Sequence, residues 1–97
     1  MRWTFESLRS RRGEILSIAE RRGMRAVRVF GSVSRGEAAE NSDVDLLVQQ
    51  EPGRSLLDLG GFAADLEELL DCRVDVVSER GLRPRFRDRV LHDAVAL

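Results

Sequence analysis

The sequence predicts an α/β (α+β) fold in which a small β-sheet of three or more strands is flanked by helices. Segments whose apolar residues recur at helical spacing alternate with short, valine-rich segments typical of strands. The strand-like segments cover residues 25–30, 43–49 and 73–77. The 97 residues are expected to form one domain, 1–97, with a modest core.

The first predicted helix covers residues 4–22 and precedes the first strand. Its apolar positions recur at helical spacing and are Leu8, Ile15, Leu16 and Ala19. Gly13 could divide this helix into two pieces, and Gly23 is a natural C-terminal stop because glycine readily adopts a left-handed conformation. After the first strand, residues 33–40 could form a short helix or a turn.

A second helix is predicted over residues 56–70, after the second strand and a turn at residues 52–53. Ser55 can cap it, with Asp58 as the reciprocal partner of a capping box. The pair at residues 60–61, both glycine, is a weak point inside this helix. The residues expected to face the sheet are Leu66, Leu69 and Leu70.

The last helix follows the third strand and begins near Pro84, a residue suited to the first helical turn. Phe86, Val90 and Leu91 form an apolar stripe along it. His92 is expected to be solvated on this helix, which argues against catalysis by histidine. Cys72 is expected to be a small core residue, because a lone cysteine cannot form an internal disulfide.

Composition excludes several classes of function. A net charge of -1 predicts no general attraction to nucleic acid or membranes, so no direct nucleic-acid binding is expected. No signal peptide and no apolar run of ~20 residues are evident, which favours a cytoplasmic protein. All 16 basic residues are arginine, so mechanisms that need a lysine nucleophile or a phosphate-binding lysine are excluded.

The residues that indicate chemistry lie at the ends of the predicted strands. Gly31 and Ser32 follow the first strand, where backbone N–H groups could approach an anion. Asp43 and Asp45 alternate on the second strand, so both side chains point to the same side about 7 Å apart. Asp75 lies between valines on the third strand, where a carboxylate requires water, a partner or a metal ion. If the two strands are neighbours, the three carboxylates cluster, and such oxygen ligands favour Mg²⁺ or Mn²⁺.

This pattern resembles the signature of the DNA polymerase β-like nucleotidyltransferase superfamily. The stretches 29–37 and 42–48 are similar to those of the minimal nucleotidyltransferases, the small antitoxin partners of HEPN-domain toxins. The likeness covers nearly the whole chain and implies a mixed sheet with the polymerase β-like fold. Ser34 stands where relatives often carry alanine, a departure without an expected effect on catalysis.

The resemblance implies a site and a reaction. Asp43, Asp45 and Asp75 would be the catalytic, metal-binding residues for two Mg²⁺ ions, with Mn²⁺ as a possible substitute. Gly31 and Ser32 would bind the triphosphate of ATP, and Arg35 either reaches a phosphate or is merely solvated. The expected reaction is transfer of AMP to a hydroxyl of a cognate HEPN toxin, in a hetero-oligomer with that toxin, with tyrosine as the expected acceptor.

Two alternatives come from other classes of protein. A non-catalytic antitoxin would neutralise the toxin by covering it, and it would not need the carboxylates. A nucleotidyltransferase acting on a small molecule would need a second domain to enclose its acceptor, and no such domain is evident in the sequence.

Overall fold

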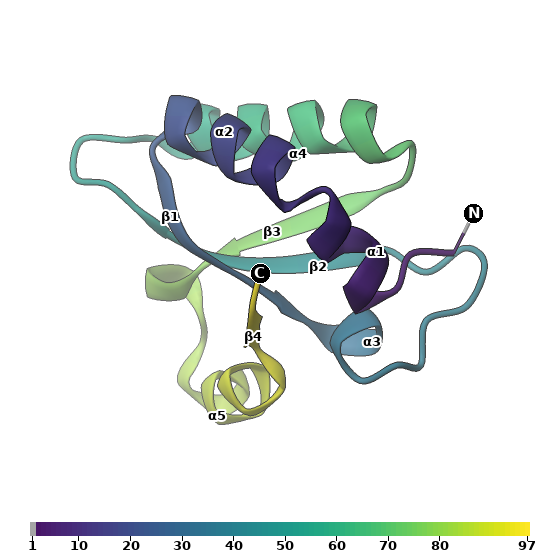
Figure 1. Cartoon of the computed structure of the whole chain (residues 1–97). Helices are drawn as coiled ribbons and strands as arrows, with labels where there is room; N and C mark the ends of the chain where they lie inside the picture. The colour runs from purple at the N-terminus through teal and green to yellow at the C-terminus, as the bar shows by residue number, and fades with distance from the viewer. Residues whose placement is uncertain (1) are drawn as a thin grey trace.

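The computed structural model describes residues 2–97, which form helices on both faces of a four-stranded sheet (Figure 1). In chain order the elements are α1 (Phe5–Ser10), α2 (Arg12–Arg22), β1 (Met24–Phe30), α3 (Gly31–Ser34), β2 (Val44–Gln50), α4 (Leu56–Leu70), β3 (Val74–Ser78), the 3-10 helix η1 (Glu79–Gly81), α5 (Pro84–Asp93) and β4 (Val95–Ala96). The predicted α/β class, with a sheet of at least three strands, is confirmed.

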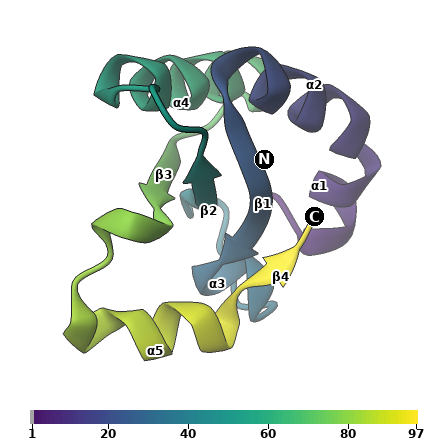
Figure 2. The same ribbon diagram turned by 90° about the vertical axis from the view of Figure 1, so that its left-hand side faces the viewer.

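The sheet is mixed and has the strand order β3-β2-β1-β4 (Figure 2). β1 pairs antiparallel with β2 and β4, whereas β2 and β3 run parallel. The parallel pair requires a crossover connection, which α4 provides. β3 is therefore an edge strand, with β2 as its neighbour in the sheet.

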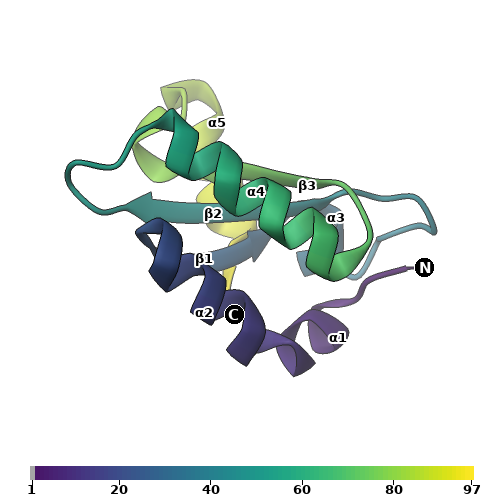
Figure 3. The same ribbon diagram turned by 90° about the horizontal axis from the view of Figure 1, so that it is seen from above.

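Helices α2 and α4 lie side by side over one face of the sheet (Figure 3). The main core forms between them and the sheet, and from β2 it receives Val44, Leu46 and Val48, each at most 1% exposed. From α4 it receives Phe62, Leu66 and Leu70. The opposite face of the sheet is crossed by α5, whereas α3 lies at the end of β1 (Figure 1).

The helix predicted over residues 4–22 is two helices, and it breaks at Arg11 instead of Gly13. Arg11 leaves the helical region with φ -101° and ψ 14°, whereas Gly13 lies inside α2. Glycine permits a break without requiring one, so tertiary packing decides where the chain turns. The predicted stop at Gly23 is confirmed, since it caps α2 in the left-handed conformation with φ 73°.

Local sequence signals located α4 well. Its bounds agree with the prediction, and the capping box is present, with Leu57 N donating to Ser55 Oγ at 3.1 Å and Ser55 N donating to Asp58 Oδ2 at 3.0 Å. The helix continues through residues 60–61 without interruption. Leu66 and Leu70 are buried as predicted, and Leu69 is partly buried against the core.

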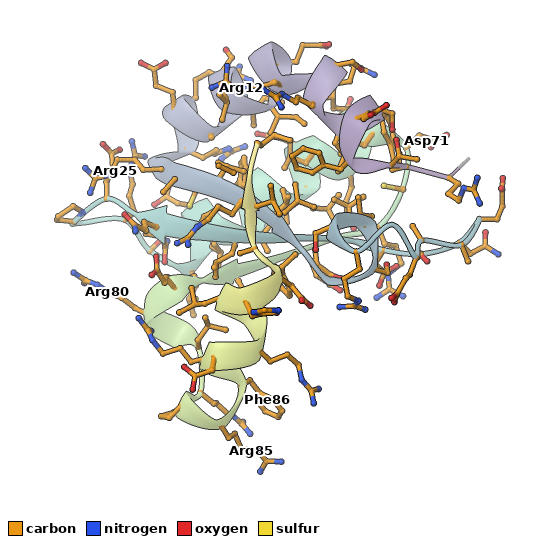
Figure 4. The ribbon with its side chains drawn as sticks, turned by 60° about the horizontal axis from the view of Figure 1, so that its bottom comes forward. Arg12, Arg25, Asp71, Arg80, Arg85 and Phe86 are labelled. Atoms are coloured by element: carbon orange, nitrogen blue, oxygen red, sulfur yellow. The ribbon has the colours of Figure 1, made fainter. Side chains whose placement is uncertain are left out.

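The C-terminal part of the fold differs from the prediction in two respects. The strand β4, of two residues, was not predicted, because a pair of exposed residues carries no recognisable strand pattern. The stripe on α5 is incomplete, since Phe86 is 40% exposed and no residue of this helix is buried. Phe86 lies with Arg85 at the end of α5 away from the sheet, the Arg85 Cζ 4.8 Å from the ring centroid (Figure 4).

The structure also tests the predictions for the strands, Cys72 and His92. The three predicted strands are present with bounds shifted by one residue. Cys72 is partly buried and packs against the core, and His92 is exposed. Over residues 2–97, none of the helices is both long enough and apolar enough to cross a membrane.

The N-terminal segment is fastened to α4 by Trp3. This side chain is 6% exposed, and its Nε1 donates to the carbonyl oxygen of Leu70 at 3.0 Å. The bond satisfies a carbonyl in the last turn of α4, which has no partner within the helix. It thereby links the chain before α1 to the start of the α4–β3 turn.

We expect Trp3→Phe to lower the free energy of unfolding by about 2 kcal/mol, because the Leu70 carbonyl loses its donor and a small cavity remains. Urea unfolding monitored by circular dichroism measures the change. Leu57→Ala is the control, since Leu57 is 86% exposed and its removal should matter by less than about 0.5 kcal/mol. Equal stabilities of Trp3→Phe and the wild type would contradict this role.

Candidate active site

The parallel register of β2 and β3 places two carboxylates beside each other. Asp45 on β2 is the register partner of Asp75 on β3. Val44 and Leu46 point into the core, so Asp45 points to the opposite face, the one that α5 crosses. Asp75 is exposed on the edge strand, whereas Asp45 is partly buried. The structure therefore brings Asp45 and Asp75 together at one end of the sheet.

The environment of Asp45 disfavours its negative charge. Burial is the largest cause, and together with the negative charges of Asp75 and Asp43 it raises the pKa of Asp45 from 3.8 to about 6. A hydrogen bond between the carboxyls of Asp45 and Asp75 acts in the same direction, whereas the positive charge of Arg35 lowers this pKa. Repulsion of this kind is what a bound cation relieves.

Asp43 is the residue directly before β2, and its side chain lies near Arg73. Its Oδ1 is 4.0 Å from Nε of Arg73, and its charge acts on both Asp45 and Cys72. Between residues 2 and 97, no three histidine, cysteine, aspartate or glutamate side chains are already grouped closely enough to hold a metal ion. The donor set, carboxylate oxygens alone, nevertheless suits Mg²⁺, with Asp45 and Asp75 as its centre.

The turn at Gly31 lies against the carboxylate of Asp45. Gly31 has a φ of 74°, and a Cβ built on it would collide with Oδ2 of Asp45. Only glycine therefore fits both the backbone conformation and the close approach of the carboxylate. Gly31 begins the short helix α3, and the partly buried Ser32 follows it directly. Within the described residues, the Ser32 hydroxyl has no hydrogen-bond partner, so it is available to a ligand.

Arg35 ends α3 and is held by two acidic side chains. Its Nη1 donates to Oδ2 of Asp93 at 2.7 Å, and its Nε donates to Oε2 of Glu37 at 3.1 Å. The Arg35 side chain stays 43% exposed in these ion pairs, so both alternatives for it, contact with a phosphate and plain solvation, stay predictions. No local pattern in the sequence marks Asp93, which lies 58 residues from Arg35.

We expect Asp45→Asn to stabilise the ligand-free protein by about 1–2 kcal/mol at about pH 8, after allowance for solvent screening. Folding raises the pKa of Asp45 from 3.8 to about 6. Between these two pH values the carboxyl of Asp45 is therefore more protonated in the folded protein than in the unfolded chain. The wild type therefore loses stability as the pH rises through that window. The advantage of the variant should accordingly shrink at about pH 4.

Urea unfolding of both proteins at the two pH values, with a chelator present, measures this difference. Asp88→Asn, at an exposed position on α5, is the matched control and should show little difference at either pH. A gain that is the same at both pH values, or no gain at all, would contradict the electrostatic origin.

The sequence comparisons agree on one family. Residues 12–97 match the nucleotidyltransferase domain family. The protein adenylyltransferase MntA of Thermococcus cleftensis is 45% identical over 78 residues, which are 80% of this chain and 79% of that protein. A Methanocaldococcus jannaschii protein that also bears the name protein adenylyltransferase is 40% identical over 82 residues, covering 84% of this chain and 88% of the other.

Solved structures extend the agreement to the fold. A structure described as a minimal nucleotidyltransferase is 56% identical and superposes with a TM-score of 0.86, covering 98% of this chain and 97% of the other. A toxin–antitoxin crystallised with AMP-PNP shares the fold, with a TM-score of 0.75 at 23% identity over 87% of this chain and 69% of the other. The chain therefore belongs to the nucleotidyltransferase domain family, as one of its minimal members.

Proposed function

We propose that the protein is an antitoxin that transfers AMP from ATP to a tyrosine hydroxyl of a cognate HEPN toxin and thereby neutralises it. The observation that carries the proposal is the pairing of Asp45 with Asp75 beside the Gly31 turn. Two sets of relatives support it, the proteins named protein adenylyltransferase and the toxin–antitoxin structures, one of which contains AMP-PNP.

The nucleotide would bind at the end of β1. Backbone N–H groups after Gly31 and the free hydroxyl of Ser32 would donate to the phosphates, and the guanidinium of Arg35 would add a charged donor. Asp43, Asp45 and Asp75 would hold Mg²⁺, which when bound neutralises charge on the triphosphate and lowers the pKa of the attacking hydroxyl. Held in this way, the α-phosphorus would be presented for in-line attack.

The acceptor would enter from the edge of the sheet. Asp75 is exposed on β3, so its carboxylate can accept the proton of a hydroxyl that another molecule presents. The oxygen then forms a bond to the α-phosphorus, the bond from that phosphorus to the bridging oxygen breaks, and pyrophosphate leaves. The chain contains no tyrosine, so a tyrosine acceptor must belong to another molecule.

The modification would inactivate the toxin through size and charge. An attached AMP adds a bulky group and a negative charge beside the catalytic groups of a ribonuclease. Both effects oppose binding of the RNA backbone, as a phosphate group would.

We expect the wild type, with ATP and Mg²⁺, to raise the intact mass of its cognate HEPN toxin by one or more AMP groups. Asp43→Asn combined with Asp45→Asn should slow this transfer by at least about 1,000-fold, because the metal ligands are lost. Mass spectrometry over a time course gives the rates. The exposed Asp88→Asn serves again as the matched control and should react at the rate of the wild type.

Two outcomes would count against the proposal. If the mass of the toxin did not change after incubation with the wild-type protein, ATP and Mg²⁺, the proposed catalytic function would be wrong. If the double variant neutralised the toxin as well as the wild type at equal concentration, neutralisation by binding alone would be the correct reading.

A further inference from the structure

One ion pair connects α5 to the candidate nucleotide site. The Nη1 of Arg35, at the end of α3, lies 2.7 Å from Oδ2 of Asp93, the last residue of α5. The side chain of Asp93 is 16% exposed, against 43% for Arg35 and 64% for Glu37, the second partner of Arg35. The contact to Asp93 is therefore the more sheltered of the two and the less weakened by solvent.

The pair leaves part of the guanidinium available. An arginine has five N–H donors in one rigid plane. The bonds to Asp93 and Glu37 use one N–H of Nη1 and that of Nε. Among residues 2–97 the remaining N–H groups, including both on Nη2, have no hydrogen-bond partner, so they are available to a ligand, while the plane of the guanidinium is fixed.

Arg35 is also fixed relative to the Gly31 turn. Its backbone N–H donates to the carbonyl oxygen of Gly31 at 3.2 Å, so it lies one helical turn from the residues expected to bind phosphate. Its positive charge is close enough to Asp45 to lower the pKa of that carboxyl. The guanidinium therefore lies at the rim of the site, between the carboxylates and α5.

The position of Asp93 is unfavourable for its own helix. The C-terminal end of a helix carries partial negative charge, so an aspartate in its last turn destabilises the helix unless a cation balances it. Arg35 supplies that cation. No residue of α5 is buried, and the pair joins the last residue of α5 to the end of α3.

We propose that Asp93 is a positioning residue for nucleotide binding: it holds the Arg35 guanidinium in the orientation in which its remaining N–H groups bind the triphosphate. The inference rests on the proposed function, because it requires ATP at the Gly31 turn. It adds a residue from the other end of the chain that acts on the nucleotide through Arg35 and without touching it.

Asp93→Asn should weaken binding of AMP-PNP in the presence of Mg²⁺ by about tenfold, since a charge-assisted hydrogen bond that orients Arg35 is lost. The KM for ATP in toxin modification should rise by a similar factor, while kcat changes by less than about twofold. Isothermal titration calorimetry and the mass assay measure these values. Asp88→Asn, on the same helix, should leave all of them unchanged.

A double-mutant cycle separates positioning from a general structural effect. In the Arg35→Gln background, adding Asp93→Asn should produce no further loss of AMP-PNP affinity, because the side chain through which Asp93 acts is already absent. Asp93→Glu, which keeps the carboxylate, should recover part of the affinity lost in Asp93→Asn.

Three results would overturn the inference. AMP-PNP could bind Asp93→Asn as tightly as the wild type, or more tightly, in which case Asp93 would withhold Arg35 from the nucleotide. The double variant could bind more weakly than Arg35→Gln alone, which would assign the effect of Asp93 to another route. If the wild type bound no AMP-PNP, that result would contradict the proposed function itself, and the role of Asp93 would fall with it.

Discussion

The parallel pairing of β2 with β3 is the constraint on which the rest of this structure depends. Because Asp45 and Asp75 occupy partner positions in register, a shift of one residue in either strand would send one carboxylate into the core. The same alternation commits Val44 and Leu46 to the opposite face, where α2 and α4 cover them. The apolar face therefore fixes the register, and the register sets the distance between the two carboxylates.

The site and the core make opposite contributions to stability. Asp45 is partly buried beside Asp75, and the residue that it contacts, Gly31, has to be glycine because a side chain there would collide with the carboxylate. Neither the partly buried carboxylate nor the glycine with positive φ stabilises the folded state of the free protein. The compensation comes from the other face of β2, whose apolar side chains are almost wholly buried. Sites that bind charged ligands commonly carry such strain, because the ligand and not the free protein completes their electrostatics.

Local structure was predictable from the sequence, whereas long-range contacts were predictable only where the expected strand order implied them. The cap at Ser55 and the stop at Gly23 depend on neighbouring residues, so their positions could be predicted and are confirmed. The approach of Asp75 to Asp45 was predictable because both lie on strands that a helix connects. The contact between Arg35 and Asp93 joins distant segments and has no local signature. The functional roles of all these site residues remain predictions.

The exposed position of Asp75 on an edge strand has a consequence for the fidelity of the proposed reaction. An opening that admits a hydroxyl carried on a folded polypeptide admits bulk water equally well, and hydrolysis would then consume the nucleotide without modifying anything. An enclosed pocket could discriminate by shape, but a shallow edge cannot. Under the proposed function, the docked macromolecule would therefore have to exclude the solvent nucleophile, so it would both supply the acceptor hydroxyl and close the open side of the site.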